Sequence, residues 1–168
     1  MKTQHNDEMQ WIHHIPQYYD TFLIMKPGFL KRSHIILETF CNAGYKVVKQ
    51  TQKELSYIEA EDLYIMHRDK DFFAELCTYM ASGFSRGYIL KSPYIGENYT
   101  INETNKLKNY FRKCYAQDDM RNVLHTSDNF MNLRREAEIY FLGEADVLCQ
   151  EDKFKEGYIA KAMNVDKH

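Results

Sequence analysis

The chain has 168 residues, of which 44% are hydrophobic and 27% charged, the composition of a soluble globular protein with one domain and some extra terminal length. Its formal net charge of −2 argues against a polybasic surface for nucleic acid or anionic membranes. The apolar runs are too short to span a bilayer, and the N-terminus lacks the apolar core of a signal peptide. We therefore expect neither nucleic acid nor a membrane as a partner.

The four cysteines, Cys41, Cys77, Cys114 and Cys149, lie 35 to 37 residues apart. No two of them have the CxxC spacing of zinc sites, and a disulfide scaffold would place them more densely. This pattern predicts isolated, reduced thiols in an intracellular protein, without a metal site.

The first half of the chain begins with a polar, histidine-containing arm at residues 1–19. A β-rich run over 20–25 predicts a strand, which Pro27 and Gly28 end. Apolar residues at helical spacing predict a helix over 30–43, with Gly44 as its C-cap, and loose alternation predicts a strand over 45–51.

The middle of the chain opens with a capping box at Ser56 and Glu59, which predicts a helix from there to about residue 66. A second helix is predicted over 71–81 and a strand over 84–91. We interpret residues 92–106 as irregular and 106–115 as helical.

A short apolar strand is predicted over 121–124, ending at His125, and a helix then runs to about residue 141. Its N-cap candidates are Thr126, Ser127 and Asp128. The remaining residues, 142–168, form a largely polar tail. Strands separated by helices predict an α/β sandwich in which helices pack on an antiparallel or mixed sheet.

The segment 121–128 carries the most specific motif of the chain. It contains Arg121, Asn122, His125, Ser127 and Asp128, and places the histidine at a strand end before a helix N-terminus, where anions are favoured. A single histidine at a strand end is more often structural, so the motif alone would not establish a function. The octet resembles the Arg-Asn-x-x-His-x-Ser-Asp segment of nucleoside diphosphate kinases.

Further residues extend this resemblance to residues 20–141, the interval that we take as the domain. Matches at the family's spacing, in chain order, are Lys26-Pro27, Tyr64, Phe72-Phe73, Leu76, Glu103-Thr104-Asn105, Arg112, His125 and Glu136. The resemblance implies a ferredoxin-like βαββαβ sandwich of the nucleoside diphosphate kinase type, within the α+β class of folds. Each residue alone could be plain core or a solvated charge, and only the ordered set favours a site.

The resemblance also implies a mechanism. His125 would take the γ-phosphate of a nucleoside triphosphate, hold it as phosphohistidine and pass it to a nucleoside diphosphate in a ping-pong reaction. Imidazole suits this role because it is nucleophilic in its neutral form near pH 7. Glu136 would accept a hydrogen bond from the second ring nitrogen and so orient the ring.

The remaining site residues are assigned by the same resemblance. Lys26 and Arg112 would neutralise phosphate charge, with hydrogen bonds from Thr104 and Tyr64, because phosphoryl transfer depends on positioning and electrostatics. Asn122 would contact the ribose, and Phe72 would stack on the base beside Leu76. The match also places Ser127 among the nucleotide-binding residues, and Mg²⁺ would arrive with the nucleotide.

Four departures from the family pattern affect the phosphate-binding region. The first turn is shorter, because Gly28 follows Lys26-Pro27 directly. The position of a second phosphate-binding arginine falls at Asn98 or a neighbour. The loop between Thr104 and Arg112 is about three residues short, and Thr126 stands where glycine is usual. Losing one cation from a phosphate clamp would remove its charge-assisted contacts and so weaken phosphate binding.

These departures resemble the divergent branch of the family, whose members occur in cilia and flagella. They keep a second hypothesis open: a weakly active or inactive structural subunit of a larger assembly, such as a ciliary or axonemal complex. Protein partners would then hold both terminal segments, and the location would be a cilium or flagellum instead of the cytoplasm. Because the shortened loop is the one that supports hexamers, we do not expect the usual hexamer.

Overall fold

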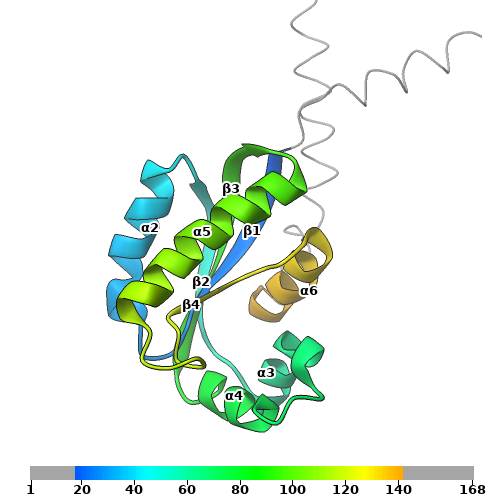
Figure 1. Cartoon of the computed structure of the whole chain (residues 1–168). Coiled ribbons are helices and arrows are strands. Elements are labelled where there is room, and N and C mark those ends of the chain that lie inside the picture. The colour runs from blue at the N-terminus through cyan, green and yellow to red at the C-terminus, as the bar shows by residue number, and fades with distance from the viewer. Residues whose placement is uncertain (1–17, 142–168) are drawn as a thin grey trace, which may run out of the picture. The chain divides into compact units, whose positions relative to one another are not determined.

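The structure is a computed structural model, and it describes residues 18–141 (Figure 1). Strands alternate with α-helices and with two short 3-10 helices, labelled η. In chain order the elements are β1 (Tyr18–Met25), η1 (Leu30–Arg32), α2 (Ser33–Asn42), β2 (Lys46–Glu54), α3 (Tyr57–Leu63), η2 (Ile65–His67), α4 (Phe73–Met80), β3 (Phe84–Ile95), α5 (Glu97–Tyr115), β4 (Leu124–Thr126) and α6 (Phe130–Tyr140).

The strands form one four-stranded sheet in the order β2-β3-β1-β4, and every neighbouring pair is antiparallel. The helices α2 and α5 each connect two strands that follow one another in the chain but are not neighbours in the sheet, which gives the βαββαβ connectivity. The predicted ferredoxin-like sandwich is therefore confirmed. β1 is a central strand, and residues 21–26 are buried whichever face of the sheet they point to.

Helices cover both faces of the sheet (Figure 1). On one face, Leu23 and Met25 share a core with the helices α2 and α5. On the other face, Phe22 packs on the rings of Tyr140 and Phe141 near the end of α6. The helix α3 packs beside α6 on that second side, and α4 packs against α3. Because antiparallel partners point to the same face, His125, opposite Ile24, projects toward the α6 side.

The capping box at the start of α3 is confirmed. The Ser56 hydroxyl accepts from the Glu59 amide, and the Glu59 carboxylate accepts from the Ser56 amide. The helix is shorter than predicted, because it ends at Leu63 and the chain continues into the separate helix η2. This break leaves Tyr64 between two helical segments, where it is buried.

The prediction of an irregular segment over 92–106 is wrong. β3 continues to Ile95, Gly96 adopts a φ of 92°, and α5 then runs without a break for 19 residues. Threonines are weak helix formers, and here tertiary contacts override that preference. Thr100 hydrogen-bonds Ser92 at 3.2 Å, and Thr104 hydrogen-bonds the Tyr45 hydroxyl at 2.7 Å. The shortened loop expected between Thr104 and Arg112 is in fact two turns of this helix.

The boundaries around His125 also differ from the prediction. His125 lies in the middle of β4 and not beyond its end. The N-cap of α6 is Asn129, whose side chain accepts from the Asn132 amide, and none of the three predicted cap residues fills this role. Ser127 is unavailable because its backbone N–H donates to Phe22 and its hydroxyl to Glu136.

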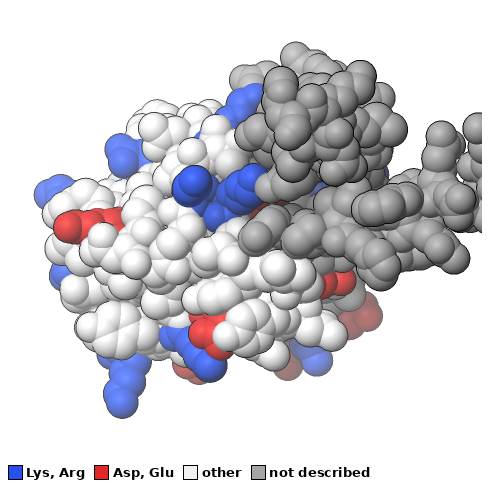
Figure 2. Space-filling view, turned by 90° about the horizontal axis from the view of Figure 1, so that it is seen from above, with Lys and Arg blue, Asp and Glu red and all other residues white. Residues whose placement is uncertain are grey.

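The predicted arm at 1–19 and tail at 142–168 lie outside the described residues, except that Tyr18 and Tyr19 begin β1. Within residues 18–141, no helix has the length and apolarity needed to cross a membrane. On the part of the surface that Figure 2 shows and the structure describes, lysine and arginine are interspersed with acidic side chains. No three His, Cys, Asp or Glu side chains of residues 18–141 are grouped so that they could hold a metal ion.

Candidate active site

His125 lies at one end of a hydrogen-bonded chain that is centred on Glu136 and joins β4 to α6. Its Nε2 atom is 3.0 Å from the Glu136 Oε2 atom, and the same carboxylate oxygen accepts from the Ser127 hydroxyl at 2.5 Å. Glu136 is 3% exposed, so its charge is held away from solvent. A carboxylate acceptor places the proton of a neutral imidazole on Nε2 and leaves the lone pair on Nδ1. The arrangement therefore presents Nδ1 as the nucleophilic nitrogen.

The backbone before His125 is strained. Val123 is fully buried and has a φ of 79°, which a β-branched residue rarely adopts. Its carbonyl accepts from the Lys26 amide at 3.0 Å, which helps to hold the conformation. Such outliers persist only where the surroundings determine them, and they concentrate at functional sites. Here the strain fixes the direction in which β4 presents His125.

Lys26 ends β1 with its ammonium group buried beside the loop that precedes β4. Its Nζ atom donates to the Asn122 Oδ1 atom at 2.6 Å and to the Met120 carbonyl at 3.2 Å, and the residue is only 3% exposed. Burial, with a smaller effect of the Arg112 charge, lowers the Lys26 pKa to about 7. A bound anion would raise the Lys26 pKa and favour the charged ammonium, which suits a residue that binds phosphate.

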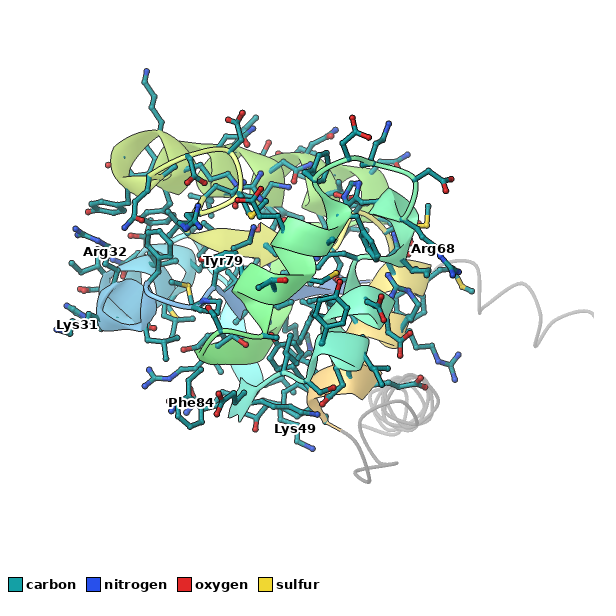
Figure 3. The ribbon with its side chains drawn as sticks, turned by 90° about the horizontal axis from the view of Figure 1, so that it is seen from below. Lys31, Arg32, Lys49, Arg68, Tyr79 and Phe84 are labelled. Carbon is teal, nitrogen blue, oxygen red and sulfur yellow. The ribbon has the colours of Figure 1, made fainter. Side chains whose placement is uncertain are left out.

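The loop that receives Lys26 is itself fixed by hydrogen bonds. The Asp118 carboxylate accepts from the backbone amides of Met120 and Arg121 and pairs with the Arg121 guanidinium at 2.7 Å. The Arg121 guanidinium lies 5.4 Å from the ring centre of Tyr79 in α4, which is labelled in Figure 3. The Asn122 side chain also donates to the Asp119 carbonyl, so its amide is oriented toward Lys26.

Arg112 reaches the site from α5, around the edge of the sheet. Its guanidinium donates to the Leu124 carbonyl at 2.9 and 3.3 Å, directly beside His125. The short strand β4 is an edge strand, so α5 can contribute side chains although its body covers the opposite face. Burial lowers the pKa of the Arg112 guanidinium, which nevertheless stays charged at neutral pH.

Tyr64 completes the wall opposite Arg112. Its ring lies 5.7 Å from the His125 ring and 5.9 Å from the Lys26 ammonium. Its buried hydroxyl has no hydrogen-bond partner among residues 18–141, and burial raises its pKa well above the usual value. A protonated phenol without a partner has an unused donor, and burying such a group is costly. It is therefore available to an oxygen-rich ligand beside His125.

A more open part of the site extends from Tyr64 toward α4. His67 lies between two rings, 6.3 Å from Tyr64 and 5.8 Å from Phe72. Phe72 is 45% exposed, whereas Leu76, one turn further along, is buried. This part offers an aromatic face to a flat ligand. Sequence reasoning missed His67, although its position three residues after Tyr64 could have indicated a shared face.

The structure does not bring every predicted residue to His125. Thr104 is buried against Tyr45 in the core, two turns before Arg112. Asn98 is exposed on the first turn of α5, about 20 Å along the helix axis from Arg112. Ser127 contacts Glu136, so its place is behind the histidine. The other predicted residues, His125, Glu136, Lys26, Tyr64, Arg112 and Asn122, form a connected group, and Phe72 and Leu76 border it.

The site combines a half-buried nucleophilic imidazole with a lysine and an arginine near it and a carboxylate behind it. This arrangement is suited to phosphorylated ligands. Comparison with known proteins gives the family. The family described as "Nucleoside diphosphate kinase" matches residues 19–145 of this chain. The chain belongs to the nucleoside diphosphate kinase family.

Curated relatives agree with this assignment. A nucleoside diphosphate kinase of Pasteurella multocida is 33% identical over 134 residues, which cover 76% of this chain and 96% of that protein. One of Anaplasma phagocytophilum is 32% identical, with coverage of 76% and 95%. These matches establish the family but not a branch of it, and the resemblance to the ciliary and flagellar branch stays a prediction.

A solved structure supports the fold. The chain is similar to the Aquifex aeolicus nucleoside diphosphate kinase with a TM-score of 0.63 at 23% sequence identity. The similarity covers 76% of this chain and 97% of the other. At this identity, the likeness extends to the arrangement of the sheet and helices alone.

Proposed function

We propose that this protein is a nucleoside diphosphate kinase that transfers a γ-phosphate through His125. The observation that carries the proposal is the contact of 3.0 Å between His125 Nε2 and the buried Glu136 carboxylate. It leaves Nδ1 with its lone pair in a site that also holds the charges of Lys26 and Arg112. Family membership supplies the substrates, nucleoside triphosphates and diphosphates.

In the first half-reaction, Nδ1 of His125 would form a bond to the γ-phosphorus while the bond from that phosphorus to the β-phosphate oxygen breaks. The nucleoside diphosphate then leaves. In the second, a β-phosphate oxygen of another nucleoside diphosphate attacks the phosphohistidine and breaks the N–P bond. Glu136 keeps the proton on Nε2 and stabilises the positive charge that the ring acquires.

The surrounding residues would each act on the nucleotide. Lys26 and Arg112 bind the phosphates, and the unpaired Tyr64 hydroxyl donates to a phosphate oxygen. Phe72 stacks on the base, with His67 beside it. We assign Asn122 mainly to positioning, because its amide already holds Lys26. Mg²⁺ would enter as part of the substrate, since it binds chiefly through phosphate oxygens and water.

The test is autophosphorylation of the purified chain with γ-labelled ATP and Mg²⁺. We expect an acid-labile label that His125→Ala abolishes and that His34→Ala, an exposed histidine on α2, retains. Unlabelled GDP should then release the label as GTP, which tests the ping-pong sequence. A label that survives in His125→Ala would contradict the proposal.

The structural-subunit hypothesis is tested by the same samples. If the folded wild-type chain gives no label and binds no nucleotide in calorimetry, the transfer proposal fails and that alternative gains support. The expectation that the chain is not the usual hexamer also remains a prediction. Light scattering that shows a stable hexamer would contradict it.

A further inference from the structure

A lysine on α5 lies near Arg112, in a site that lacks the second phosphate-binding arginine of the family pattern. The family resemblance places this arginine at Asn98 or a neighbour, and the structure leaves Asn98 exposed at the far end of the helix from Arg112. Lys108 is four residues, about one turn, before Arg112, so both side chains project from the same flank of α5.

Two contacts fix how α5 runs past the histidine segment. Near its start, the Glu97 carboxylate accepts from the Phe130 amide at 2.7 Å. Near its end, Arg112 donates to the Leu124 carbonyl at 2.9 Å. The helix therefore runs antiparallel to the segment 124–130. Lys108 falls between these two anchors, one turn from the Arg112 end, and so lies alongside residues 125–128.

The electrostatic environment of Lys108 agrees with this placement. The side chain is half-buried, and burial together with the Arg112 charge lowers its pKa, while Asp128 and Glu136 act in the opposite direction. The charge of Lys108 also contributes to lowering the pKa of Lys26. Three cations, Lys26, Lys108 and Arg112, are thus close enough to affect one another around His125. Like charges held together in this way are stabilised by a polyanion.

We propose that Lys108 is a phosphate-binding residue of this site and supplies, beside Lys26 and Arg112, a third cationic contact to the phosphates beyond the α-phosphate. The proposal rests on the proposed function for the identity of the ligand. The continuous helix α5 makes the contact possible, because a loop between Thr104 and Arg112 would not hold Lys108 one turn from Arg112. The simplest competing role for Lys108 is a structural one beside Asp128.

The test compares nucleotide affinities by calorimetry in a His125→Ala background, in which no phosphate is transferred. The probes are Mg–ATP, Mg–ADP and AMP. Lys108→Met keeps much of the length of the side chain but removes its charge, and Lys108→Arg restores a cation. Lys113→Met is the matched control, because Lys113 is an exposed lysine of the same helix.

We expect Lys108→Met to lower the affinity for Mg–ATP or Mg–ADP by about 10- to 150-fold, the effect of one charge-assisted contact. The affinity for AMP should fall by less than about threefold. Lys108→Arg should bind each nucleotide with an affinity within about threefold of the His125→Ala chain. Lys113→Met should bind them with the same affinity as the His125→Ala chain. Asn98→Arg should have no effect on these affinities.

Two results would overturn the proposal. In one, Lys108→Met binds the three nucleotides like Lys113→Met. In the other, it loses affinity for AMP as much as for Mg–ATP, as a structural role would require. Labelling of the wild-type chain judges the proposed function separately. If the wild-type chain binds nucleotides but forms no phosphohistidine, the proposed phosphate transfer is wrong. The affinities of the Lys108 and Lys113 variants for the three nucleotides would still decide the role of Lys108.

Discussion

The two sides of the candidate site are built differently. On the histidine side, formed by β4 and α6, His125, Ser127 and Glu136 are joined by hydrogen bonds of 2.5 and 3.0 Å, and the carboxylate is buried. On the side where we propose that the nucleoside binds, called the nucleoside side and formed by η2 and the start of α4, His67 and Phe72 meet through ring contacts and are exposed. One side is fixed before a ligand arrives, and the other is accessible.

This difference has a physical reason. Charge development in a transition state requires groups that are already oriented, since reorganisation at the moment of reaction would cost free energy. A stacked ring, in contrast, needs only a flat partner and cannot strongly discriminate between bases. The comparison predicts large effects for changes on the histidine side and small, base-independent effects on the nucleoside side.

The largest effect is expected for Glu136→Ala. It removes the acceptor that sets the His125 tautomer and leaves the Ser127 hydroxyl without its partner. We expect phosphohistidine formation to slow on the order of 100-fold, within the range for positioned proton-transfer partners. The measurement is the rate of labelling from γ-labelled ATP.

Glu138→Ala is the matched control, because Glu138 is an exposed carboxylate on the same helix. It should label at the wild-type rate. Equal rates for the two alanine variants would show that Glu136 has no part in activating the histidine.

The second prediction concerns the packing that holds α6, and with it Glu136, against the sheet. A Cβ atom on Gly87 of β3 would meet the Tyr140 ring at 2.8 Å and Phe22 at 3.1 Å. We expect Gly87→Ala to lower the free energy of unfolding by about 1–3 kcal/mol, as overpacking does. Urea denaturation measures this change.

Gly83→Ala is the control for Gly87→Ala, since its Cβ would have no neighbour closer than 3.9 Å. It should leave stability within about 0.5 kcal/mol of wild type. A Gly87→Ala chain as stable as Gly83→Ala would mean that α6 is free to move away from the sheet.

The third prediction follows from the buried Lys26, whose pKa lies at about 7 in the folded chain. In the unfolded chain, lysine keeps its proton to about pH 10, so between these values the unfolded state binds more protons. The free energy of unfolding should therefore rise with pH above 7, by up to about 1.4 kcal/mol per pH unit from this group.

Urea denaturation from pH 6.5 to 9 measures this slope in the wild-type chain and in Lys26→Met. The variant should lose the Lys26 contribution, while Lys31→Met, which changes an exposed lysine labelled in Figure 3, should keep it. Parallel profiles for wild type and Lys26→Met would show that Lys26 does not titrate in this range.

The smallest effect is expected for Phe72→Ala on the nucleoside side. Loss of a half-exposed stacking ring should lower the affinities for ADP and GDP by similar factors of about fivefold, or about 1 kcal/mol of binding free energy. Phe84→Ala is the control, because Phe84 is 51% exposed and lies well apart from Arg68, the neighbour of His67, in Figure 3. A loss for one base only would indicate specific recognition in place of stacking.

Much of this protein could be predicted from its sequence alone, because the signals are local. The capping box at Ser56, the turn at Gly28 and the apolar run of β1 depend on neighbouring residues. They correctly predicted the start of α3, the end of β1 and the strand itself. The resemblance to the nucleoside diphosphate kinases singled out Arg112, His125 and Glu136. In the structure His125 contacts Glu136, and Arg112 donates to the carbonyl of Leu124, the residue before His125.

Tertiary structure alone decided the rest. The threonine-containing start of α5 is helical because Ser92 and Tyr45, from distant segments, bond Thr100 and Thr104. The same bond removes Thr104 from the site. The burial of Lys26 against the loop before β4, and the position of Lys108 beside Arg112, depend on how distant segments pack. Hydrogen bonds and electric fields act through space, so a linear pattern cannot specify which of its polar residues will lie together.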